Sequence, residues 1–235
     1  ERVNYIVDSI IICGEVGGSI GIKFNHSKSA CMVIGPNKIG WPLPMLIAGS
    51  AIQWVESIQY LGVTLKSASK FTVDLARVKR KFFVAVNSIL YHCSYTSDLV
   101  KLELMEKHCL PILLYCVESL SLEHDSLKVL NSWWNSIYRK IFGFNRWESV
   151  KSLICMLGRL DLHHIINYQS IIFSKRLIYS DNCVIRILYK NLPQSPELHG
   201  LLQLAKAKLE WPTHRIKSQM YDSFRSICGL HLLST

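Results

Sequence analysis

The spacing of apolar residues predicts a short mixed region at the start of the chain. Residues 1–16 carry apolar side chains every three to four positions, which predicts a helix stopped by the glycines at positions 14, 17 and 18. Two β-prone runs, Ile20–Phe24 and Ala30–Ile34, flank the polar turn Asn25-His26-Ser27-Lys28. Three more strands are expected, at Leu46–Ala48, Ile52–Val55 and Tyr60–Leu65.

After Lys66 the apolar period becomes helical. One apolar seam is formed by Phe71, Leu75, Val78, Phe82, Val86 and Ile89. A different face at the same spacing carries Lys70, Asp74, Arg77 and Lys81. Two further helices are predicted, one from a cap at Thr96-Ser97-Asp98 to Cys109 and one from Pro111 to about Leu122. Another has an apolar face formed by Leu127, Leu130, Trp134, Ile137 and Ile141. The last helices are predicted over about 148–157, 161–180, 183–191, 198–209 and 213–227.

These patterns predict an α+β chain. We expect a small antiparallel sheet with one helix in residues 1–66, a mainly helical region in 67–145 and a further helical region in 146–235. The change of period near Ser67 is the clearest of these boundaries.

Charge is unevenly distributed along the chain. The net charge is +10, yet residues 1–65 carry four basic and four acidic side chains, whereas residues 66–107 carry eight and four. A basic surface attracts polyanions by releasing their condensed counterions, so nucleic acid is the partner class that the excess favours. A solvated lysine-rich face is the alternative.

The eight cysteines show no Cys-x-x-Cys pair, and we interpret them as buried, reduced thiols of an intracellular protein, nuclear or cytoplasmic. Cys228 and His231 have a ligand-like gap, but no second pair accompanies them, so no metal site is predicted. Apolar stretches are too short to span a bilayer, so no membrane partner is expected.

The order of several short motifs along the chain is informative. Gly21-Ile22-Lys23-Phe24-Asn25 leads to Lys28, and Trp54–Gly62 ends on Tyr60-Leu61-Gly62. Lys79-Arg80-Lys81-Phe82-Phe83 follows, and further segments include Pro111–Tyr115, Trp133–Gly143, Arg146–Val150 and Leu157–Leu162. In this order they resemble the reverse transcriptase of non-LTR (LINE-type) retrotransposons, from the end of the palm through the thumb into the following helical region. The resemblance covers roughly residues 1–190.

The resemblance implies roles for particular residues. Lys28 matches a palm lysine near the incoming nucleotide's phosphates, where a cation assists departure of pyrophosphate. Tyr60, Leu61 and Gly62 match the tip of the hairpin that holds the primer end. Lys70, Arg77, Lys79, Arg80 and Lys81 match a thumb helix that contacts the phosphates of a template–primer duplex.

Plainer interpretations stay open for each of these residues. Lys28 also fits an ordinary solvated lysine in a turn. Tyr60-Leu61-Gly62 also fits an ordinary strand and turn, and the five basic residues also fit a solvated helix face. Trp133, Trp134 and Trp147 suit base stacking, but tryptophans on helical seams more often belong to a core.

The paired catalytic aspartates of that family are not in this chain, which has no Asp-Asp pair. Its polymerase step needs two Mg²⁺ ions held by carboxylates, so Lys28 would have no reaction to assist. We therefore expect a fragment of an RNA-directed DNA polymerase that is inactive alone and binds no cofactor itself. Its expected partners are RNA–DNA or double-stranded nucleic acid and the missing N-terminal polymerase portion. A non-enzymatic helical interaction protein, or an inert relic of a retroelement, is the alternative.

This hypothesis makes one spatial prediction. The turn that carries Lys28 and the hairpin that ends at Gly62 should share a sheet, with basic helices beside it.

Overall fold

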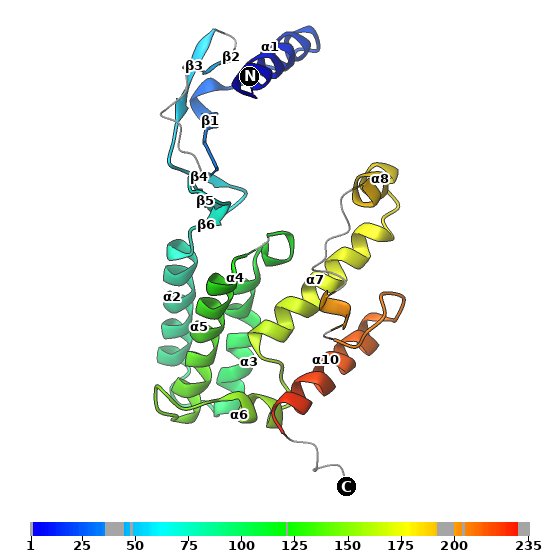
Figure 1. Ribbon diagram of the computed structural model, residues 1–235. Coiled ribbons are helices and arrows are strands. Elements are labelled where there is room, and N and C mark those ends of the chain that lie inside the picture. Colours follow the sequence, from blue (N-terminus) through cyan, green and yellow to red (C-terminus); the bar gives the residue numbers. More distant parts are fainter. Residues whose placement is uncertain are drawn as a thin grey trace. The chain divides into compact units, whose positions relative to one another are not determined.

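The computed structural model describes residues 2–35, 45–47, 49–120, 122–191, 200–203 and 205–229 (Figure 1). The chain forms two compact units, Glu1–Arg77 and Val78–Thr235, which we call the N-terminal unit and the helical unit. Residues 78–145 of the predicted thumb and the whole predicted C-terminal region thus fall in the helical unit, whereas residues 67–77 fall in the N-terminal unit. The division at residues 66 and 145 stays a prediction.

Helix α1 (Arg2–Ser19) runs further than the glycines suggest. It passes through Gly14, Gly17 and Gly18 and ends at Ser19, two residues before Gly21, whose φ is +77°. There the Ile22 N–H donates to the Gly17 carbonyl at 2.8 Å and the Gly21 N–H to the Gly18 carbonyl, a Schellman closure. The predicted stop at the earlier glycines was wrong because none of them takes up the left-handed conformation that ends a helix.

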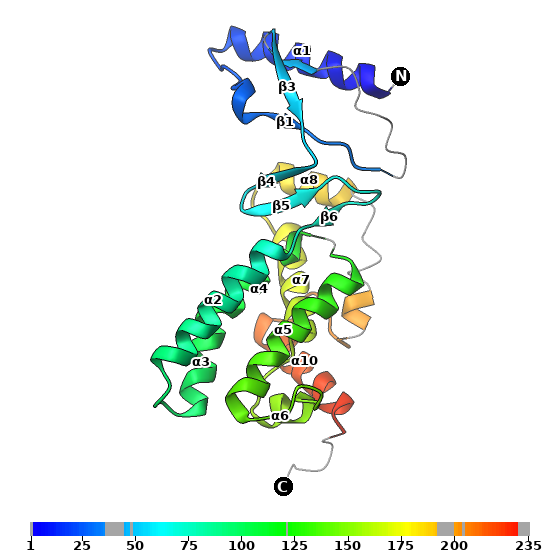
Figure 2. The ribbon, with the colours of Figure 1, turned by 90° about the vertical axis from the view of Figure 1, so that its left-hand side faces the viewer.

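A first sheet has the strand order β1-β3-β2, with β1 at Ala30–Cys31, β2 at Met45–Ile47 and β3 at Ser50–Trp54. Strand β1 pairs with β3 in parallel, and β2 pairs with β3 antiparallel. In Figure 2 these strands lie beside α1. The predicted strand Ile20–Phe24 does not form, and Asn25 is followed by a short 3₁₀ turn, η1 (His26–Lys28).

A second sheet has the order β4-β5-β6, at Ser57–Tyr60, Val63–Lys66 and Thr72–Val73, and is antiparallel throughout. The expectation of one antiparallel sheet was therefore wrong, and so was the prediction that Lys28 and Gly62 share it. The two sheets are joined by the Ser67 hydroxyl, which donates to the Val33 carbonyl at 2.7 Å, and by the Gly35 N–H, which donates to the Ala68 carbonyl.

The rest of the described chain is helical. Helices α2 to α5 cover Ala76–His92, Asp98–His108, Leu110–Leu114 and His124–Phe142, with a 3₁₀ turn η2 at Val117–Ser119. Helices α6, α7, α8 and α10 cover Lys151–Met156, Leu162–Ile178, Cys183–Asn191 and Thr213–Ile227. The mixed α+β class is thus confirmed.

The core of the helical unit follows the predicted seams. Phe82 and Val86 of α2 are fully buried, and Leu130, Trp134 and Ile137 of α5 are each at most 1% exposed. Side chains at i, i+3 and i+4 share one face of a helix, which is why the seams were readable.

Three helix predictions were wrong at their ends. Phe71 and Leu75 precede α2, since β6 and the turn after it occupy those positions. The helix from Pro111 stops at Leu114, and Cys116 beyond it has a φ of +60°. Of the predicted 198–209 helix, the described residues are helical over 200–203 and turn-like from 205.

The cysteines are free thiols, of which Cys109 and Cys155 are buried. Cys13 and Cys183 are exposed, so the expectation that all are buried was wrong. In the described part of the chain, no helix combines the length and apolarity that crossing a membrane requires.

Candidate nucleic-acid interface

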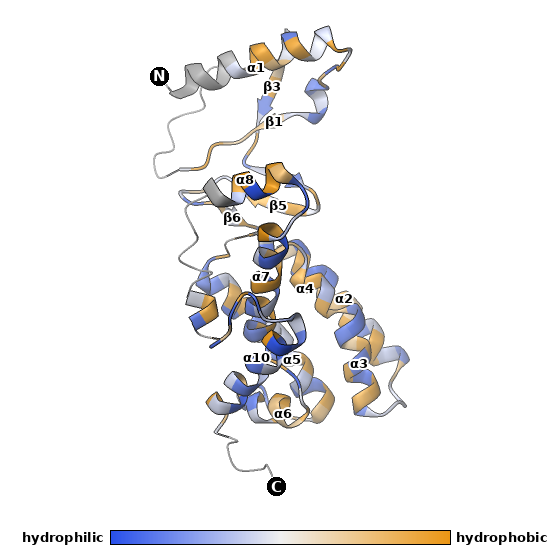
Figure 3. Ribbon diagram, turned by 90° about the vertical axis from the view of Figure 1, so that its right-hand side faces the viewer, coloured by the Kyte–Doolittle hydropathy of each residue, from blue (hydrophilic) through white to orange (hydrophobic). Residues whose placement is uncertain are grey.

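The first turns of α2 gather four cations. Arg77, Lys79, Arg80 and Lys81 are all exposed, and α2 has no acidic residue along its length. None of the four forms an ion pair within the described residues. Polar and apolar residues alternate along this helix in Figure 3. We call these four residues the basic turn.

The position of the basic turn is electrostatically unfavourable for the free protein. A helix N-terminus carries a partial positive charge, so cations in the first turn, here Arg77 and Lys79, destabilise the helix by about 0.3–1 kcal/mol each before screening. An anion at the same place is stabilised by both the dipole and the side chains. The sequence therefore puts its densest positive charge where a bound phosphate would relieve the repulsion.

One acidic residue stands at the start of this helix. The Asp74 carboxylate accepts the Ala76 N–H at 2.9 Å and pairs with the Lys66 ammonium at 3.1 Å. The Ala76 N–H and Lys66 together lower the pKa of Asp74. Because Lys66 already neutralises this carboxylate, it offers little compensation to the basic turn.

Lys70 does not belong to the basic turn. It lies in the exposed segment between β5 and β6, and its carbonyl accepts the Thr72 hydroxyl at 3.2 Å. The prediction that Lys70, Asp74, Arg77 and Lys81 share one helix face is therefore wrong for Lys70 and Asp74, because the chain is not helical at these two positions. Arg77 and Lys81 do share a face, four residues apart on α2.

Lysines and aromatic rings alternate where α2 meets α5. The Lys79 ammonium lies 5.9 Å from the centroid of the Trp133 ring, and the Lys140 ammonium 5.7 Å from that of Phe83. The two rings meet edge to face, with centroids 6.2 Å apart. We call Lys79, Phe83, Trp133 and Lys140 the α2–α5 face. Sequence reasoning missed it, since only the packing of two distant segments brings it together.

The three tryptophans singled out by sequence have different environments. Trp134 is 1% exposed and belongs to the core, whereas Trp133 is half-buried. Trp147 is 86% exposed, with the Arg146 guanidinium 5.0 Å from its ring centroid. The core interpretation is confirmed for Trp134 alone.

Lys28 lies at the end of η1 and is exposed. The Asn25 side chain holds this turn by accepting the N–H groups of Ser27 at 3.0 Å and Lys28 at 3.3 Å. No acidic side chain pairs with Lys28 in the described structure. This geometry suits an ordinary solvated lysine as well as a phosphate ligand.

Tyr60, Leu61 and Gly62 lie at the tip of the β4–β5 hairpin. Leu61 and Gly62 have φ values of +45° and +84°, which is the backbone of a tight type I′ turn. Tyr60 and Leu61 are 63% and 71% exposed. The sequence predicted the tip of the hairpin at these residues. The two strands of the hairpin are residues 57–60 and 63–66, so the prediction of a single strand over Tyr60–Leu65 was wrong.

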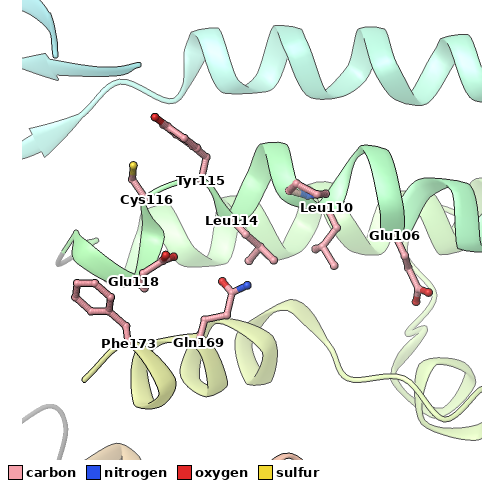
Figure 4. Close-up of a pocket in the computed structure, with 9 residues that line it drawn as sticks. Glu106, Leu110, Leu114, Tyr115, Cys116, Glu118, Gln169 and Phe173 are labelled. Atoms are coloured by element: carbon pink, nitrogen blue, oxygen red, sulfur yellow. The ribbon is translucent and has the colours of Figure 1, made fainter. Parts of the chain in front are cut away.

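A cleft of about 410 Å³ lies between α4, η2 and α7, with Gln169 and Phe173 of α7 facing Leu114 and Glu118 (Figure 4). The carboxylates of Glu106 and Glu118 line it. Glu106 also accepts from the Arg159 guanidinium at 2.8 Å. Carboxylates repel phosphate, so this cleft is a poor candidate for nucleic acid.

The described residues do not fit a Mg²⁺ site. No group of three or more His, Cys, Asp or Glu side chains gathers in the described parts of the chain. His231, which pairs with Cys228 in the sequence, lies outside them. We therefore derive no metal-dependent step from these residues, and the absence of polymerase activity stays a prediction.

Among the described residues, Asp161 and His164 form the most buried ion pair, which lies at the start of α7. The Asp161 carboxylate begins α7 by accepting the His164 N–H at 2.9 Å, and it contacts His164 Nδ1 at 2.6 Å. Burial opposes ionisation of Asp161, but these two hydrogen bonds, together with electrostatic attraction to His164 and His163, outweigh it and lower the pKa of Asp161. The His164 ring packs on the core residue Phe224, with centroids 4.8 Å apart.

Comparison of the chain with protein-family models, curated proteins and solved structures gives no match. The functional argument therefore depends on the residues themselves.

Proposed function

We propose that this chain is part of a LINE-type reverse transcriptase that lacks the catalytic aspartates and binds RNA–DNA or double-stranded nucleic acid without reading its sequence. The basic turn of α2 is the observation that carries the proposal. Its cations are exposed, free of acidic partners in the described chain and placed at the positive end of a helix. Contacts between such side chains and phosphates carry no sequence information.

The exposed apolar surface of the N-terminal unit supports the second half of the proposal, namely that another polypeptide segment covers it. Ile11, Ile12 and Val16 of α1 are each more than half exposed. Large contiguous apolar patches usually mark an interface. The missing N-terminal polymerase portion is the partner that the resemblance implies.

A titration with a labelled RNA–DNA hybrid tests nucleic-acid binding. Four phosphate contacts predict an affinity that falls on the order of 100-fold between about 50 and about 200 mM monovalent salt. Absence of binding, or binding that does not respond to salt, would reject the proposal.

Two triple variants of equal charge locate the contact. Lys79→Gln, Arg80→Gln and Lys81→Gln together should reduce the slope of log affinity against log salt by about 2.7, at about 0.9 per contact. The control variant combines Lys101→Gln, Lys107→Gln and Lys128→Gln, which are paired with Asp98, Glu103 and Asp125. It should keep the original slope. Equal losses in both variants would mean that net charge, and not the basic turn, determines binding.

A primer-extension assay tests the predicted inactivity. With an annealed RNA template, DNA primer, Mg²⁺ and deoxynucleotides, the purified chain should extend no primer. Extension that depends on Mg²⁺ would refute this part of the proposal.

A further inference from the structure

We propose that the α2–α5 face binds an unpaired stretch of nucleic acid by stacking one base on Trp133, while Lys79 and Lys140 contact the phosphates on either side. This inference rests on the proposed function and adds to it a substrate class, a strand with unpaired bases.

The first support is that Trp133 is only half-buried, beside a neighbour that is fully buried. Trp134 lies on the apolar face of α5 that forms the core, whereas Trp133 is partly accessible at its edge. One turn earlier on the same row, Val129 is 41% exposed. The helix thus has its large core residue in Trp134, whereas Trp133 lies at the edge of the core, with its ring in edge-to-face contact with Phe83.

The second support is the charge around the aromatic pair. Lys79 and Lys140 stand over different rings, at 5.9 and 5.7 Å from the centroids, so cations flank the pair. Both distances are near the limit of about 6 Å for a cation–π contact, so the lysines are weakly held and able to reach a phosphate. Helix α2 has no acidic residue, and the single one of α5, Asp125, is paired with Lys128.

An aromatic side chain between cations fits a single strand better than a duplex. In a duplex both faces of each base are covered by neighbouring base pairs, whereas an unpaired base has a free face to stack. Such stacking tolerates any base and contributes roughly fivefold to more than 100-fold to affinity at each base.

The test separates stacking from charge by using strands that differ only in their bases. The whole chain is titrated with labelled oligodeoxyadenylate and with an abasic strand of the same length. Trp133→Leu removes the ring, and Trp133→Phe keeps an aromatic ring in its place. Trp147→Leu is the matched control, since Trp147 is exposed and lies beside Arg146 but outside this face.

We expect Trp133→Leu to weaken oligodeoxyadenylate binding at least about fivefold and to leave abasic binding unchanged. Trp133→Phe should stay close to the original affinity, and Trp147→Leu should not differ from it. Unchanged abasic binding also shows that the Trp133→Leu protein is folded.

Two results would overturn the inference. Either Trp133→Leu binds oligodeoxyadenylate as tightly as the original chain, or it loses affinity equally for both strands. If the original chain still binds the RNA–DNA hybrid in a salt-dependent way, the proposed function survives that failure. If the original chain binds none of the three ligands, the proposed function fails with it.

Discussion

The N-terminal unit and the helical unit differ in how much apolar surface they bury. Among side chains that the structure describes, the N-terminal unit buries two apolar residues, Met45 and Ile52, whereas the helical unit buries 24. In the N-terminal unit Ile20, Ile22 and Phe24 are among the apolar residues left exposed. Among the described residues, the helical unit gathers its apolar side chains into a large core, and the N-terminal unit leaves most of its own at least partly exposed.

The physical reason lies in the elements. Each long helix of the helical unit contributes an apolar stripe that several neighbours cover at once, as α5 does between α3 and α7. The sheets of the N-terminal unit have strands of two to five residues, and small sheets need a packed face to be stable. We therefore expect the helical unit to fold by itself and the N-terminal unit to depend on a partner.

Separating the units should give the largest effect. A chain of residues 74–235, which keeps the Asp74 cap, should melt cooperatively and retain its helical circular dichroism. Residues 1–73 should show no cooperative transition. A cooperative melt of the shorter piece would contradict the comparison.

Matched phenylalanine substitutions should show the same difference within the whole chain. Phe82→Ala removes a ring with 0% exposure, and should cost about 3–5 kcal/mol of unfolding free energy. Phe71→Ala removes a ring that is 41% exposed in the N-terminal unit, and should cost less than about 1 kcal/mol. Denaturant titration measures both, and similar costs would mean that the N-terminal unit has a tighter core than its burial shows.

Substitution of Asp161 should have an effect of intermediate size on the stability of the helical unit. Asp161→Ala removes the α7 cap and the His164 contact, for a loss of about 1–2 kcal/mol near neutral pH. Asp161→Asn keeps a capping oxygen and should lose less. Urea denaturation of the two variants checks the order, and a larger loss for Asp161→Asn would show that the negative charge matters more than the cap.

The same residue gives a pH dependence. Because the pKa of Asp161 is lowered on folding, the folded state binds fewer protons than the unfolded state between the two pKa values. Its contribution to stability is complete above the ordinary value of 3.8 and is lost as pH falls through the folded pKa. Asp161→Ala should therefore lose less stability than the original chain on acidification below about pH 4. An identical acid response in both proteins would contradict this assignment.

The smallest effect should come from the hairpin tip. Leu61 occupies a left-handed position that asparagine tolerates better, so Leu61→Asn should stabilise the hairpin by about 0.5–1 kcal/mol. Gly62→Ala should destabilise it by about 1 kcal/mol, since φ there is +84°. Amide hydrogen exchange of the β4–β5 ladder measures both. No change in either variant would mean that the turn is not what holds the hairpin together.

The same contrast explains which sequence predictions succeeded. Helices α8 and α10 have the predicted bounds, and the α5 seam is correct, because helical periodicity is local. Strand pairing is not local: β1 pairs in parallel with β3 across more than twenty residues, and nothing in either strand reveals that choice. The division into two sheets was missed for this reason.

The candidate site divides in the same way. The basic turn was predictable, since its four cations are near neighbours on one helix. Lys70 was misplaced because the periodic pattern continues through β6, where the Asp74–Lys66 pair and the ladder to β5 replace the helix. The α2–α5 face joins residues about fifty positions apart, so only the packing reveals it.

The central claim is that the helical unit, together with the start of α2, carries the nucleic-acid contact without the sheets, and the salt dependence of hybrid binding by residues 74–235 tests it most directly. We predict the same affinity and the same slope against salt as the whole chain, although Lys28, Tyr60 and Lys70 have been removed. A folded 74–235 fragment with a much shallower slope, or with no binding, would contradict the account.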